Sequence, residues 1–179
     1  MDRRQEEAYA MASADIGLRE VKGPRHSTEI VQMFADVGHS WVKDDETAWC
    51  AAFVGAMLER AGLPSTRKLN ARSYTTWGEA VALDDAKPGD VVVFSRGDPN
   101  GWQGHVGFFV RRAGTHIEVL GGNQSDQVSI ARYPVSRMLG VRRWPHEPLA
   151  APAPQAPKGL TAIIAAIVAA IRAVFRRQK

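Results

Sequence analysis

The sequence predicts an α+β fold, in which helices come first and an antiparallel sheet follows. Apolar residues recur at helical spacing through much of the first third of the chain, and they alternate with polar residues along segments of the second half. Two of the alternating segments are separated by so few residues that they read as a hairpin. Helices segregated from an antiparallel sheet are the α+β layout.

Two helices are expected near the N-terminus. The pattern of residues 6–21 is compatible with a helix, and a Gly-Pro pair separates it from the next one. Residues 27–37 carry apolar side chains at helical spacing after a capping hydroxyl at Ser27 or Thr28.

A third helix is the clearest of all. Its apolar positions fall on one face, and they are Phe53, Val54, Met57, Leu58 and Ala61. Gly62 and Pro64 end the run, because glycine favours the helix C-terminus and proline cannot continue it. Cys50 is therefore expected in the first turn of this helix.

Five strands are expected after the helices. They are residues 91–94, 105–112, 115–120, 128–132 and 139–144. If the hairpin turns at Ala113 and Gly114, His105 lies opposite Gly122 and beside Asn123. Glu118 is then opposite Phe109, four residues along the strand and roughly 13 Å from His105 at about 3.3 Å per residue.

The C-terminal part has a different composition. Prolines at positions 145, 148, 152, 154 and 157 lie among alanines, which is typical of a semi-rigid linker. From Leu160 onward, apolar residues form one stripe of a helix, and arginines follow it. The predicted organisation is a folded domain at residues 1–144, a linker at 145–158 and a cationic amphipathic helix at 159–179. The apolar run of this helix is too short to span a membrane. A coiled-coil seam is the alternative reading of the stripe.

The C-terminal segment differs in charge from the rest of the chain. Residues 158–179 hold five of the 23 basic residues and none of the 19 acidic ones, so the formal charge of +4 leaves −1 for the rest. A nucleic-acid-binding body is poorly supported, since it needs a basic surface on the folded domain. An anionic bacterial membrane is the expected partner of the C-terminal helix.

A single cysteine allows no internal disulfide and leaves Cys50 free for chemistry. The charged N-terminus lacks the apolar segment of a signal peptide. We therefore expect a protein made in the cytoplasm, which needs membrane permeabilisation or export if it acts outside that compartment. No group of side chains has the spacing of metal ligands, so no metal or other cofactor is expected.

Cys50 has the setting of a nucleophile. The unpaired N–H groups and positive dipole end of a helix N-terminus lower a thiol pKa. The alternative is a small, buried apolar residue at the head of an apolar helix. Among the five histidines, His105 is the candidate base, because it opens a strand from which its ring can reach a helix end. The amide of Asn123, within reach by the hairpin register, can orient it.

The chain contains five motifs in order, which are WCAAFV, KPGDVVVF, GHVGFFV, VLGGNQ and SRMLGVRRW. In these motifs the sequence resembles the NlpC-type and CHAP superfamily of cysteine peptidoglycan hydrolases, with the greatest similarity to its phage-associated branch. The resemblance covers residues 6–144. It implies a papain-like fold, Cys50 as nucleophile, His105 as base and Asn123 as the third polar residue. Many CHAP relatives have a glutamate two residues before that asparagine, where this chain has Gly121.

The resemblance implies an endolysin-like function, which is hydrolysis of a peptidoglycan amide bond through a thioester by a peptidase or an amidase that works as a monomer. It also implies that the protein acts at the bacterial cell wall or periplasm after membrane permeabilisation or export. By analogy, the backbone N–H of Cys50 contributes to the oxyanion hole. Arg72, Ser73 and Trp77 are candidates for the substrate groove, although capping and core packing explain them equally well. Two alternatives stay open: a secreted antibacterial effector with the same chemistry, and a non-catalytic membrane-active or wall-binding protein.

Overall fold

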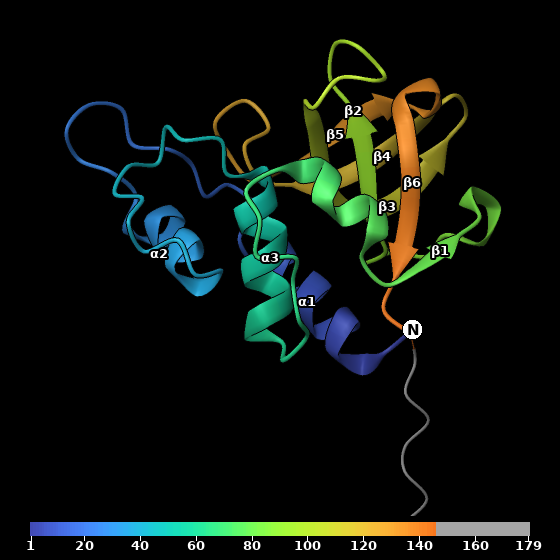
Figure 1. The fold of residues 1–179 in the computed structure, drawn as a ribbon, viewed down its shortest axis with the longest axis horizontal. Coiled ribbons are helices and arrows are strands. Elements are labelled where there is room, and N and C mark those ends of the chain that lie inside the picture. The colour runs from blue at the N-terminus through green and yellow to red at the C-terminus, as the bar shows by residue number, and fades with distance from the viewer. Residues whose placement is uncertain (146–179) are drawn as a thin grey trace, which may run out of the picture. The chain divides into compact units, whose positions relative to one another are not determined.

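The computed structural model describes residues 1–145, in which helices and an antiparallel sheet occupy different sides of the domain (Figure 1). The predicted α+β class is confirmed. The elements in chain order are α1 Arg3–Ala14, α2 Thr28–Asp36, α3 Cys50–Arg60, η1 Ala71–Thr76, β1 Glu79–Val81, η2 Leu83–Asp85, β2 Val91–Ser95, β3 Gly104–Ala113, β4 His116–Gly121, β5 Ser129–Pro134, η3 Val135–Arg137 and β6 Met138–Arg143. The predicted linker beyond Pro145 and the predicted C-terminal helix lie outside the described residues.

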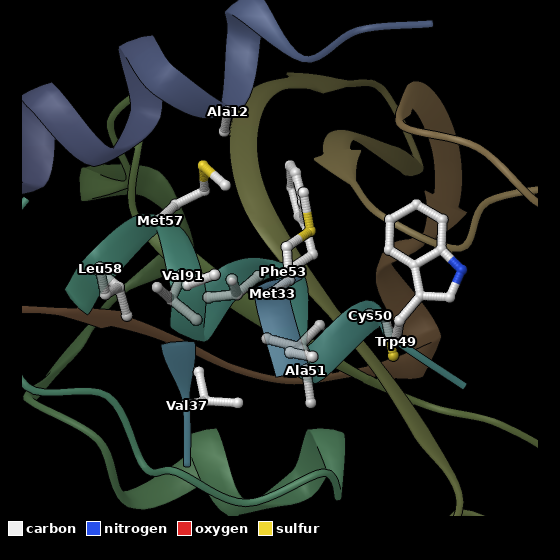
Figure 2. Packing of buried hydrophobic residues seen from close by; sticks show 14 of the residues in the cluster. Ala12, Met33, Val37, Trp49, Cys50, Ala51, Phe53, Met57, Leu58 and Val91 are labelled. Carbon is white, nitrogen blue, oxygen red and sulfur yellow. The ribbon is translucent and has the colours of Figure 1, made fainter. Parts of the chain in front are cut away.

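The helix α3 forms the centre of the core. All its residues from Cys50 to Leu58 are buried, and it contacts α1, α2 and the sheet. Figure 2 shows its side chains between Ala12 of α1 and Val37, which follows α2. The helix α2 begins where predicted, since the Ser27 hydroxyl accepts a hydrogen bond from the N–H of Ile30.

The helix α1 is shorter than the predicted residues 6–21. It ends at Ala14, and Gly17 takes a left-handed backbone with φ of 96°. The chain after it runs beside the loop that follows β4, where Arg19 pairs with Gln127. The sequence did not indicate this break, because residues 15–20 mix Ile16 and Leu18 with charged side chains, and such a pattern with one glycine is compatible with a continuous helix.

The six strands are ordered β1-β6-β2-β3-β4-β5, and all neighbours are antiparallel. Alternate residues of β2 serve two cores: Val91 and Val93 pack towards the helices, whereas Val92 and Phe94 pack on the opposite face. The short edge strand β1 was not predicted. After β6, the N–H of Trp144 donates to the side chain of Gln5, which joins the end of the sheet to α1.

Among the described residues, no helix is long and apolar enough to cross a membrane.

Candidate active site

Cys50 is the first residue of α3, as the sequence predicted, and only 7% of it is exposed. Trp49 precedes it as the fully buried N-cap residue, and its indole N–H donates to Glu20. Figure 2 shows both side chains at the same end of the helix. The thiol is therefore fixed at a helix N-terminus by the packing of its neighbour.

The electrostatics of the thiol differ from the expectation. Burial raises the pKa of Cys50 above its ordinary value, although the N–H of Val106, the charge of Arg96 and the N–H groups of the helix start all lower it. The expected net lowering by the helix N-terminus is thus wrong, because a thiolate in this dry position loses more hydration than the N–H groups return. The resting side chain is a neutral thiol.

His105 lies one residue inside β3 and is completely buried. Its Nε2 is 3.1 Å from Oε1 of Gln124, and the amide NH₂ of Gln124 donates to the carbonyl oxygens of Ser129 and Val119. Since those carbonyls can only accept, the Gln124 amide must present its oxygen to the ring. His105 therefore carries its proton on Nε2 and leaves Nδ1 as the basic nitrogen.

The second ring nitrogen of His105, Nδ1, is available to accept a proton. Nδ1 makes no hydrogen bond with any atom that the structure describes. Tyr133 stacks on the ring at 4.8 Å between centroids with an interplanar angle of 14°. Burial and the nearby charge of Arg96 lower the pKa of His105 to about 3. The imidazole is neutral at physiological pH and able to accept a proton.

The structure places Asn123 differently from the register argument. Asn123 lines the same pocket as Cys50, but the amide that contacts His105 belongs to the next residue, Gln124. The hairpin turns at Gly114 and Thr115, because Ala113 pairs with His116.

The pairing continues with a register shift between Phe109 and Arg111, so Glu118 lies opposite Arg111 rather than Phe109. Beyond the end of β4, Asn123 has a φ of 55°, which breaks the alternation of side chains that the register argument assumed. A Cβ at Gly121 would lie 3.1 Å from Nε2 of His105, so this glycine leaves the space in which Gln124 approaches the ring. The glycine at position 121, where many CHAP relatives have a glutamate, therefore goes together with the contact of Gln124 with His105.

A pocket of about 190 Å³ opens beside Cys50. Its walls include Asn123, Gly104, the Arg96 side chain and Trp102, and Trp102 is 75% exposed. A larger hollow of about 640 Å³ lies along β1 and η2, but none of the predicted site residues lines it. We place the chemistry in the smaller pocket, since it contains the thiol.

The other groove candidates have structural roles. Arg72 donates to the backbone carbonyls of Asp98, Pro99 and Gln103, and Ser73 bonds to Thr66. The Trp77 ring is buried and donates to a backbone carbonyl. Within residues 1–145, no three acidic, histidine or cysteine side chains gather as metal ligands.

Solved structures share this fold. A variant of RipA, a resuscitation promoting factor interacting protein, is 18% identical with a TM-score of 0.51, over 81% of this chain and 64% of that chain. A hypothetical invasion protein of Mycobacterium tuberculosis is 19% identical over the same shares, also with a TM-score of 0.51. The P60 domain of an antigen from M. avium subspecies paratuberculosis is 13% identical, with a TM-score of 0.50, over 79% of this chain and 94% of that one. This chain thus spans less than two thirds of the first two.

The fold is of the papain-like class. In this class a buried thiol begins a central helix, the helix packs against an antiparallel sheet, and a histidine lies at the start of one strand. Residues 42–123, which include Cys50, His105 and Asn123, match the CHAP domain. This match covers less than half of the chain, so it shows a CHAP-like region within a fold that the chain shares with a P60 domain. Among curated proteins, no sequence matches it significantly.

Proposed function

We propose that this protein hydrolyses an amide bond of bacterial peptidoglycan by cysteine catalysis, in the manner of an endolysin. One observation carries the proposal, namely the combination of a thiol and a neutral imidazole in one site. Cys50 lines the pocket next to Gly104, the residue before His105. The Nε2 of His105 is bonded to Gln124, and its Nδ1 has no hydrogen-bond partner among the described atoms. The CHAP match supports the class of substrate.

The chemistry begins with general-base activation, since both groups are neutral at rest. Nδ1 of His105 takes the thiol proton as the sulfur of Cys50 forms a bond to the amide carbonyl carbon. The C–N bond then breaks, and the amine leaves with that proton, which leaves a thioester on Cys50. His105 next takes a proton from a water whose oxygen attacks the thioester. The proton returns to the sulfur as the S–C bond breaks.

The backbone contributes to the same steps. The N–H groups at the start of α3 and the N–H of Val106 face the thiol, where they lower the cost of negative charge on the sulfur. We assign the N–H of Cys50 to the oxyanion of the tetrahedral intermediate, by analogy with the superfamily. Gln124 stays on Nε2 and stabilises the imidazolium that forms transiently.

The test is turnover of purified peptidoglycan, followed by release of new amino groups. Cys50→Ser and His105→Ala should each abolish turnover while circular dichroism stays unchanged, because nucleophile and base act as one unit. His116→Ala is the matched control, since His116 is at the start of β4 and its ring bonds only to Thr115 among the described residues. Retained turnover in Cys50→Ser would remove the mechanism, and mass spectrometry of the wild-type products identifies the bond.

We assign a separate role to residues 159–179, in which a helical apolar stripe is followed by arginines. Such a segment binds at the interface of anionic membranes. It would aid access to the cell wall after membrane permeabilisation or export.

A further inference from the structure

The pocket beside Cys50 contains one cationic side chain, Arg96, and its described lining contains no acidic side chain. The charge of Arg96 disfavours the imidazolium of His105 and favours the ionised forms of Cys50 and Tyr133, although burial keeps the pKa of Cys50 and of Tyr133 above their ordinary values. A side-chain hydrogen bond also links Arg96 to Tyr133. The guanidinium therefore lies close to the reacting groups, where substrate must pass.

Arg96 differs from most arginines of the domain in having no carboxylate partner. Within residues 1–145 it takes part in none of the ion pairs. The arginines that do pair with Asp or Glu include Arg60, Arg67, Arg112, Arg132 and Arg143. Because a guanidinium has five N–H donors, Arg96 keeps donors for a carboxylate beside its hydrogen bond to Tyr133.

The backbone holds Arg96 in this place. It directly follows β2, and its N–H donates to the carbonyl of Gln103 across the base of the loop between β2 and β3. Arg72 fixes the far side of this loop through the same carbonyl of Gln103 and two others. The guanidinium thus extends from an anchored position, which limits the entropy lost when it binds a ligand.

We propose that Arg96 binds a free carboxylate of the peptidoglycan stem peptide next to the scissile amide, and so selects acidic over amidated peptides. This inference rests on the proposed function. A bound carboxylate also offsets the charge that disfavours the imidazolium of His105, so the substrate itself strengthens the base.

The test uses Cys50→Ala protein, which cannot turn its ligand over. Its affinity is measured by calorimetry for a synthetic stem peptide with free carboxylates and for the same peptide with carboxamides. We expect roughly tenfold tighter binding of the acidic peptide, in keeping with a charge-assisted hydrogen-bonded pair. Adding Arg96→Gln should abolish the preference. Arg25→Gln, the same charge change at an exposed residue outside the pocket, should keep it.

Equal affinity for the two peptides, no measurable binding of either, or a preference that survives Arg96→Gln would each overturn the inference. Turnover of whole peptidoglycan by the wild-type protein is scored separately. If the protein degrades peptidoglycan but binds the two peptides equally, only the proposed role of Arg96 is wrong. If it prefers the acidic peptide but does not degrade peptidoglycan, the role of Arg96 is supported and the proposed hydrolase function is wrong.

Discussion

At the scale of single residues, the site is built to keep a thiol and an imidazole neutral. Burial opposes the charged form of both Cys50 and His105, and Arg96 favours the thiolate while it disfavours the imidazolium. The His105 pKa of about 3 keeps the base unprotonated through the weakly acidic range. If His105 is the base, its protonation should not limit turnover of purified peptidoglycan between pH 7 and pH 5, which a pH profile measures.

The titration of Cys50 follows from the same burial. Since its pKa is raised, the rate of alkylation by iodoacetamide should increase with pH and reach half its maximum above the ordinary thiol value of about 8.5. Cys50 is the single cysteine of the chain, so the label is unambiguous. Urea-unfolded protein provides the ordinary value. An inflection below pH 7 in the folded protein would instead indicate a thiolate–imidazolium pair at rest.

Gln124 should be the residue that orients His105. Gln124→Leu removes the acceptor of the buried Nε2–H, so kcat/KM on a soluble substrate should fall by about 100-fold or more. Gln124→Glu keeps an acceptor and adds a negative charge, which raises the His105 pKa and moves the acid limb of the pH profile upward.

Asn123→Gly is the matched control for Gln124, because glycine accepts the φ of 55° at that position without strain. It should cost much less than Gln124→Leu. The opposite order would restore Asn123 as the third member of the site.

The sequence was sufficient to locate Cys50 and His105, because each opens an element with a clear apolar pattern. Their catalytic roles remain predictions. Gln124 was missed, although it directly follows Asn123. Two features decide which amide reaches the His105 ring: the hairpin turn is shifted by one residue, and Asn123 has a left-handed backbone. Neither feature can be detected from the local pattern of apolar and polar residues. A buried Cys50 was predicted only as the alternative to a nucleophile, whereas the packing of the whole domain makes this thiol both buried and part of a pocket wall.

At the scale of elements, α3 and the loop after β4 are in unusually close contact. A Cβ on Gly122 would overlap the Trp49 ring and would lie 2.7 Å from Cβ of Phe53. The helix start that carries Cys50 therefore requires a glycine on the opposing loop. This contact joins segments that are far apart in the sequence.

Gly122→Ala should lower the free energy of unfolding by about 1–3 kcal/mol, the usual cost of overpacking a core. Urea unfolding gives the value, and activity should fall with it because Trp49 adjoins the nucleophile. Gly140→Ala is the control, since a Cβ there meets nothing within 4 Å. Its effect should stay within about 0.5 kcal/mol. Equal stability of the two variants would mean that the loop moves away from α3 at little cost.

The elements themselves were largely predictable. The helices α2 and α3 and the five longer strands follow apolar periodicity and turn residues. The edge strand β1 has only three residues, with two exposed, so it has no apolar pattern to detect. The early end of α1 depends on the pairing of Arg19 with Gln127, a contact between distant segments.

At the scale of the whole molecule, the separation of charge predicts a division of labour. A chain ending at Ala156 should keep its fold and its turnover of purified peptidoglycan, because the last strand ends at Arg143. Its action on intact cells should fall. The full-length protein should bind anionic vesicles and gain helicity, less so at high salt. Loss of the fold on truncation, or absence of vesicle binding, would contradict the membrane role.

The attachment of the loop between β2 and β3 also bears on how proteins with this fold diversify. Arg72 holds this loop through the main-chain carbonyls of Asp98, Pro99 and Gln103, which every amino acid supplies. The side chains of the loop, including the exposed Trp102 at the pocket, take no part in that anchorage. Sequence changes there can alter what the pocket accepts while its position is conserved. The loop is consequently the place to graft new substrate preferences onto this scaffold.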